Sequence, residues 1–220
     1  MEYYEIEKQE HGLHVHGFPD AVKLLKLSNA KAKRLADLAL HKHDLDFALQ
    51  CLDGINLVAE EPYALRLALW RSAIIHYFKC FGNSAARFSL DQRVIYAGEP
   101  LAIENFEFFR LLRNKNIVHD ENSYTQCIPG AVLNKAGMEH KIAKILCSSF
   151  HGEVLGQDSF SNLRLLITHA TEWVTRQFDE FCNKITADLE SLKYEELYKM
   201  ESVTYSKPTM HDLSRNRNVL

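Results

Sequence analysis

The sequence lacks several features that would place it in a familiar class of proteins. No apolar run approaches the roughly 20 residues of a transmembrane helix, and the acidic start, Met1–Glu5, does not resemble a secretory signal. None of the five cysteines belongs to a CxxC pair, which favours free thiols in a reducing compartment. Walker-type loops, Rossmann glycine fingerprints, HExxH and GxSxG are all missing. We therefore expect a cytoplasmic protein without membrane contact, cofactor or metal.

Excess positive charge is also lacking over the whole chain but not in one part of it. The net charge is −3 over 220 residues, which argues against wholesale, sequence-independent binding of nucleic acid. Between Arg66 and Lys115, however, eight Lys/Arg face four Asp/Glu, and this local excess of four leaves the remainder near −7. A local patch of this kind can hold a few phosphates within an acidic protein.

Apolar residues recur at helical spacing in four long segments. The first covers about 29–53, with Ser28 as its N-cap, and is either one helix or two with a break near residues 41–44. The others run over 63–81, 100–118 and 159–199. Short connections between such helices predict an all-α fold, an up-and-down helical bundle of four or more helices.

The remaining segments predict smaller elements. Leu13 and Val15 indicate a short extended piece, and residues 21–27 a helical turn or two. Segments 126–133 and 141–150 fit a β-hairpin insertion, although their apolar spacing fits a helix almost as well. We expect an N-terminal extension over 1–27, the helical bundle over 28–200 and a flexible C-terminal tail over 201–220. The polar stretch His41–Asp44 is interpreted as an exposed turn.

One short motif carries chemistry, at the end of the third apolar helix: Arg113-Asn114-Lys115-Asn116-Ile117-Val118-His119. Arginine holds phosphate through two parallel hydrogen bonds, and histidine moves protons near neutral pH. RNA contains its own nucleophile, the 2′-hydroxyl, so cleavage needs only a base, an acid and a cation for the phosphorane. His119 can act as base or acid, Arg113 can stabilise the phosphorane, and Asn114 can position either. No metal is required.

Geometry limits how these groups meet. On an ideal helix, Arg113 and His119 are about 9 Å apart along the axis and roughly 120° apart in rotation. They converge within one chain if the helix ends near Val118 or if the long arginine wraps round it. A two-fold dimer through this helix would instead bring two arginines and two histidines into one cleft. Such a homodimer would supply a separate acid and base.

Four further cations are candidates for weak substrate binding. Arg110 and Lys115 flank the motif, and Arg71 and Lys79 lie on the preceding apolar helix. Each of them fits an ordinary solvated helix face as well. In the same way, Arg113 can be a surface ion-pair former and His119 a residue that the helix dipole favours at a C-terminus.

The segment Leu111–Asp120, with its Arg-Asn and its His six residues after the Arg, resembles the signature of the HEPN superfamily, and in particular abortive-infection-type members. The resemblance covers roughly 28–120 and the long last helix. It implies a helical bundle that dimerises across the motif helix, and metal-independent endoribonuclease activity in phage defence or toxin–antitoxin growth control. Arg113, Asn114 and His119 would be catalytic, RNA the substrate, and an antitoxin or other regulatory protein a partner. Glu121 stands where toxins paired with nucleotidyltransferase antitoxins tend to carry tyrosine.

Two other functions remain open from the sequence. The large apolar circumference of the third helix suits a non-catalytic helical module that binds a partner protein or a nucleotide. His11, His14 and His16 could form a metal cluster, but no acidic or cysteine companion lies nearby at a familiar spacing.

Overall fold

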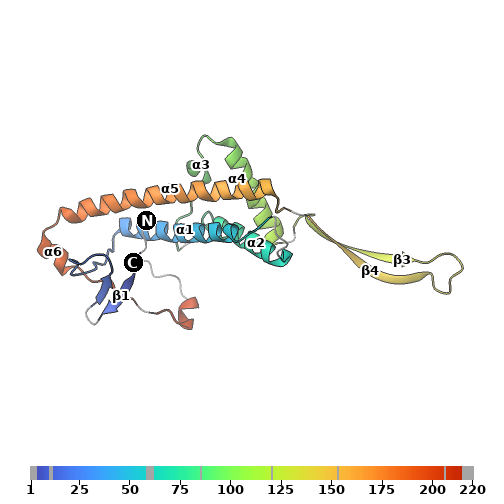
Figure 1. The fold of residues 1–220 in the computed structure, drawn as a ribbon, viewed down its shortest axis with the longest axis horizontal. Coiled ribbons are helices and arrows are strands. Elements are labelled where there is room, and N and C mark those ends of the chain that lie inside the picture. Colours follow the sequence, from blue (N-terminus) through green and yellow to red (C-terminus); the bar gives the residue numbers. More distant parts are fainter. Residues whose placement is uncertain are drawn as a thin grey trace. The chain divides into compact units, whose positions relative to one another are not determined.

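The computed structural model describes residues 4–9, 12–57, 62–84, 86–119, 121–152, 154–205 and 207–214. Helices dominate it (Figure 1), and the long ones are α1 (Ala30–Asp53), α2 (Tyr63–Lys79), α4 (Pro100–Leu112) and α5 (Gln157–Glu190). The short helical elements are α3 (Gln92–Ile95), η1 (Arg113–Ile117), α6 (Tyr194–Lys199) and η2 (Met210–Ser214). Two antiparallel hairpins pair β1 (Ile6–Gln9) with β2 (Gly12–Val15), and β3 (Thr125–Leu133) with β4 (Ile142–His151). Among the described helices, none combines the length and apolarity needed to cross a bilayer.

The predicted long helices are present with small shifts at their ends. The first is one uninterrupted helix, α1. The last is shorter than predicted, because α5 ends at Glu190 and a separate helix, α6, starts at Tyr194. The predicted hairpin is confirmed as β3–β4: Thr125 pairs with His151 at its base and Leu133 with Ile142 near its tip. Its loop contains Gly137 at φ 90°, a conformation that suits glycine.

The predicted helical turn at 21–27 is wrong. This segment is not helical, and Leu25 forms an antiparallel bridge with Ser202. Lys26 N–H donates to the carbonyl of Glu201 at 2.7 Å, and Val203 N–H donates to the carbonyl of Leu24 at 2.9 Å. The partner strand comes from the far end of the chain, so the local apolar pattern could not reveal it.

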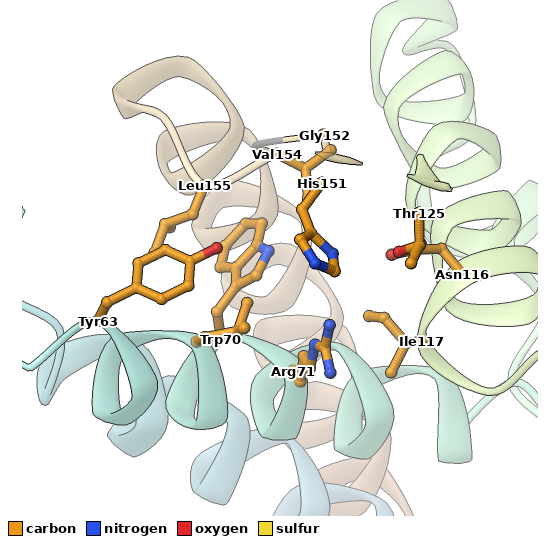
Figure 2. A pocket seen from close by; sticks show the side chains of 11 residues that line it. Tyr63, Trp70, Arg71, Asn116, Ile117, Thr125, His151, Gly152, Val154 and Leu155 are labelled. Atoms are coloured by element: carbon orange, nitrogen blue, oxygen red, sulfur yellow. The ribbon is translucent and has the colours of Figure 1, made fainter. Parts of the chain in front are cut away.

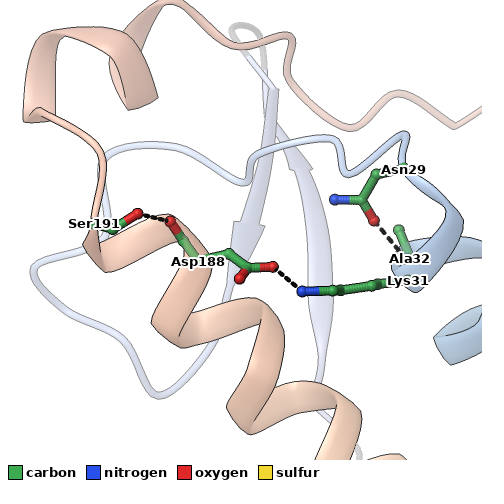
Figure 3. Close-up of polar contacts among 5 residues, drawn as sticks. All are labelled: Asn29, Lys31, Ala32, Asp188 and Ser191. Atoms are coloured by element: carbon green, nitrogen blue, oxygen red, sulfur yellow. Dashed lines mark hydrogen bonds and ion pairs between the residues drawn. The ribbon is translucent and has the colours of Figure 1, made fainter.

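Helix α1 begins one residue later than predicted. Its cap is Asn29 rather than Ser28, since Asn29 Oδ1 accepts a hydrogen bond from Ala32 N–H at 2.8 Å (Figure 3). In the same first turn, Lys31 Nζ pairs with Asp188 near the end of α5 at 2.5 Å. Ser191 Oγ donates to the carbonyl of Asp188 at 2.6 Å, where α5 ends.

The chain forms two compact units, and the first comprises Met1–Asp44, Gly82–Leu90 and Ala170–Leu220. Here the start of α1 meets the end of α5 through the Lys31–Asp188 pair. The stretch predicted as an exposed turn lies inside α1, and its His41 and Asp44 are buried. That prediction was wrong because Arg87 pairs with Asp44 at 2.7 Å from a distant part of the chain.

The second unit comprises Leu45–Phe81 and Asp91–His169 and holds the predicted motif. Helices α2 and α4 pack antiparallel in it: Tyr77 meets Phe106 and, one to two turns away, Trp70 meets Phe109, with ring centroids 6.1 and 5.9 Å apart. The hydroxyls of Tyr77 and Tyr96 lie 2.5 Å apart, and Tyr96 donates to a backbone carbonyl of α5 at 2.8 Å. This buried aromatic core fixes the end of α4, from which the motif continues.

Candidate functional site

The first five residues of the motif form a single π-helical turn, η1, directly after α4, and Val118 and His119 follow it. Its closing bond runs from Val118 N–H to the carbonyl of Arg113 at 3.0 Å, five residues back rather than four. Such turns are rare and frequently occur at functional sites. The sequence predicted ordinary helix to Val118, whereas helical structure ends at Ile117.

Arg113 is held in a defined position in this turn. Its side chain is half-buried, and Nη1 donates to Asn114 Oδ1 at 2.8 Å. Its Nε is buried and has no hydrogen-bond partner among the described residues. Asn114 thus orients the guanidinium, which keeps N–H donors for an anion.

Arg66 on α2 adds a second guanidinium that sequence reasoning did not select. Its Nε is also buried without a partner in the described part of the chain. Trp70 meets Phe109 across the antiparallel helices, and Arg66 and Arg113 each lie about one turn further along in the same direction. The two arginines therefore stand at the same end of the α2–α4 contact, where no described acceptor pairs their Nε atoms.

His119 is exposed and follows the π turn. Within the described residues, neither Arg113 nor Asn114 is hydrogen-bonded to it. One chain thus joins Arg113 to Asn114 and leaves His119 open to solvent at the helix end.

The weaker candidates divide into two groups. Arg110 is paired with Glu107 through Nε at 2.8 Å and Nη2 at 2.5 Å, and Lys115 and Lys79 are exposed. Arg71 differs, because it lines a pocket of about 210 Å³ beside the π turn. The remaining lining residues come from α2, the π turn, the hairpin base and the segment after it: Tyr63, Leu67, Trp70, Asn116, Ile117, Thr125, His151, Gly152, Val154 and Leu155.

The pocket gathers polar groups from distant parts of the sequence (Figure 2). Arg71 and His151 point toward each other across it, and Asn116 and Thr125 lie on the far side. Thr125 and His151 are paired across the strands, so both side chains belong to one face of the hairpin. Asn116 Nδ2 donates to Thr125 Oγ1 at 3.4 Å, which ties the π turn to the hairpin.

Sequence reasoning missed His151, and the available signal was the hairpin register. Once strands 126–133 and 141–150 are paired, the residues just outside them meet at the base, next to the end of the motif. At the next residue, Gly152, a Cβ would come within 2.6 Å of the Tyr124 ring. Its N–H donates to the carbonyl of Tyr124 at 2.6 Å.

The histidine cluster near the N-terminus can be followed only in part. His11 and the side chain of His14 lie outside what the structure describes. No group of three or more His, Cys, Asp or Glu that could hold a metal ion occurs among the described residues.

Comparison with known proteins gives no assignment: no family model, no curated protein and no solved structure matches the chain. Function therefore has to be inferred from the residues themselves.

Proposed function

We propose that the protein is a metal-independent endoribonuclease of the HEPN type, with an up-and-down bundle as its core, acting in prokaryotic phage defence or toxin–antitoxin growth control. The observation that carries the proposal is Arg113, oriented by Asn114 in a π turn and left with a buried, unpartnered Nε. Buried N–H groups are nearly always paired, so one without a partner calls for an explanation. An RNA phosphate supplies the missing acceptor.

Each motif residue has a distinct role in this reaction. One His119 takes the proton of the 2′-hydroxyl, which attacks the adjacent phosphorus. Arg113 stabilises the charge that builds on the phosphorane oxygens, with Asn114 fixing its direction. A second His119 protonates the departing 5′-oxygen. The products are a 2′,3′-cyclic phosphate and a 5′-hydroxyl.

A homodimer through α4 supplies the second histidine. Three large apolar side chains on one face of α4 are exposed: Leu101 at 69%, Phe108 at 39% and Leu111 at 46%. They lie at helical spacing, whereas Phe106, Phe109 and Leu112 face the core. Burying this face against a second copy removes apolar surface from water beside the motif.

The test is incubation of purified protein with single-stranded RNA or tRNA in EDTA. Fragments with 2′,3′-cyclic phosphate ends are expected. His119→Ala should lower the rate by about 10²–10⁴-fold, the usual contribution of an acid–base group. His140→Ala is the matched control, because this exposed histidine lies in the hairpin loop, and it should cut normally. Full cutting by the His119 variant would overturn the assignment.

A non-catalytic module that binds a partner protein is the second candidate, and the β3–β4 hairpin favours it. Ile128, Val132, Leu146 and Phe150 share one face of the hairpin and are exposed. Two-stranded hairpins are at best marginally stable alone, so a partner covering this face would stabilise the β3–β4 hairpin. This candidate predicts no RNA cleavage under any metal condition, and loss of partner capture in an Ile128→Ser/Phe150→Ser variant.

A further inference from the structure

We infer that the pocket beside the π turn binds a phosphate group of a nucleotide, with Arg71 and His151 as its ligands. The inference rests on the proposed function only for the source of that phosphate, an RNA chain held at the motif. The site is separate from Arg113 and His119, neither of which lines it.

The polar lining of the pocket suits an anion. Arg71 offers a guanidinium fork, His151 an imidazole and Asn116 an amide, and among the described residues that line the pocket none carries a carboxylate. Arg71 makes no hydrogen bond or ion pair within the described chain, so its donors are available. A planar fork with a nearby ring N–H matches the tetrahedral oxygens of a phosphate.

Trp70 gives an independent indication. Its side chain is fully buried, yet the indole Nε1 has no hydrogen-bond partner among the described residues. Figure 2 shows this nitrogen on the side of the ring that faces His151, toward the pocket. A buried N–H without an acceptor costs free energy, and a ligand oxygen entering the floor of the pocket would remove that cost. The side chains of Tyr63 and His151, which also line the pocket, are exposed.

The position and volume of the pocket limit which ligands it can bind. Asn116 and Ile117 belong both to the π turn and to the pocket wall, so the pocket adjoins the turn that holds Arg113. Its volume of about 210 Å³ is below the roughly 300–1,000 Å³ of sites for drug-sized ligands. It therefore accommodates a phosphate with part of its nucleotide, as a chain running past the scissile bond would present.

The test measures binding apart from cleavage. A fluorescent, 2′-O-methylated single-stranded RNA, which has no 2′-nucleophile, is titrated into His119→Ala protein. Adding Arg71→Ala should weaken binding by roughly 10–100-fold, as expected for loss of a charge-assisted hydrogen-bonding group. His151→Ala should weaken it less. Arg176→Ala removes the same charge from an exposed site on α5 outside the pocket, and so controls for general electrostatics.

Competition identifies the source of the phosphate. Displacement of the RNA by a nucleoside 5′-monophosphate, lost in Arg71→Ala, means that the pocket takes the phosphate of a free nucleotide. Binding of RNA alone, again dependent on Arg71, means that it takes a phosphate within the chain. Equal binding by the Arg71 and Arg176 variants would overturn the inference, and RNA cleavage by the unsubstituted protein in EDTA would show that the proposed nuclease survives that result.

Discussion

Each unit of the molecule contains a cluster of buried arginine and histidine or tryptophan side chains, and the two clusters differ in how the arginine is paired. In the first unit, Arg87 meets Asp44 at 2.7 Å with side chains only 9% and 4% exposed, and His41 Nε2 lies 2.8 Å from the carbonyl of Phe88. In the second, Trp70 and Arg113 keep buried N–H groups with no acceptor among the described residues. The buried arginine of the first unit has a carboxylate partner and holds structure together, whereas the two N–H groups of the second unit lack a described acceptor and suit a ligand.

The paired cluster fastens a loop to a helix. Residues 82–90 meet α1 through Arg87 and through Phe88, whose N–H donates to Asp37 at 3.4 Å. Burial, and then the charge of Arg87, lower the pKa of His41 to about 4. The histidine is therefore neutral near pH 7 and serves as a structural group rather than as an acid or base.

The largest effect on stability is expected from breaking the buried ion pair. Asp44→Ala leaves Arg87 buried without its partner, which should cost about 3–5 kcal/mol of unfolding free energy. Urea denaturation measures it, and the double variant Asp44→Leu/Arg87→Met should recover most of the loss. A cost below about 1 kcal/mol for Asp44→Ala would show that the cluster does not fasten the loop.

The pH dependence of stability should come next in size. The folded-state pKa of His41 is about 4, below its ordinary value near 6.5, so the unfolded chain binds the proton first as the pH falls. The stabilisation is complete above pH 6.5 and is lost as the pH falls through about 4, in total of the order of 3 kcal/mol. Urea midpoints between pH 7 and pH 4 follow it. In His41→Gln this part of the slope should vanish; an unchanged slope would assign it to other groups.

A pair of substitutions in the second unit contrasts a paired group with an unpaired one. Tyr77→Phe removes a hydroxyl that is bonded to Tyr96 and should cost about 1–3 kcal/mol. Trp70→Phe removes an N–H that has no partner among the described residues, so relief of its burial offsets the lost packing and stability should stay within about 1 kcal/mol. Thermal and urea unfolding measure both. Equal large losses would mean that the Trp70 N–H is satisfied in the folded protein.

The smallest effect belongs to an exposed pair. Lys31 and Asp188 meet at 2.5 Å, but their side chains are 44% and 54% exposed. Lys31→Ala should therefore change stability by less than about 1 kcal/mol, and less still at high salt. Urea unfolding in low and high salt measures this, with Lys33→Ala on the same helix as control. A loss as large as that of Asp44→Ala would erase the distinction between exposed and buried pairs.

The elements that depend on the local pattern of apolar residues could be predicted from the sequence. The spacing of Phe106, Phe109 and Leu112 and the position of Pro100 predicted α4, and the segments 126–133 and 141–150 fitted the β3–β4 hairpin, with a helix left open as the alternative. The π turn could not be predicted, because one residue per turn is added only where the helix end packs against α2.

Contacts between residues that are far apart in the chain could not be predicted from the sequence. The polar side chains of His41 and Asp44 indicated an exposed turn, because nothing in the neighbouring sequence shows that Arg87 pairs with Asp44. Arg71 was selected by its charge alone, whereas His151 and the N–H of Trp70 become relevant only when the hairpin base closes over α2.

The ligand site proposed at Trp70 can be tested with the NMR signals of the two indole N–H groups. The chain has two tryptophans, Trp70 in the second unit and Trp173 in the first, so a ¹⁵N–¹H spectrum of His119→Ala protein contains two indole N–H peaks, which Trp70→Phe assigns. On titration with 2′-O-methylated RNA, the Trp70 peak should move saturably to lower field as its N–H gains a phosphate acceptor, while the Trp173 peak stays in place. RNA binding that leaves the Trp70 peak unmoved, or shifts both peaks alike, would contradict a ligand site in the unpaired cluster.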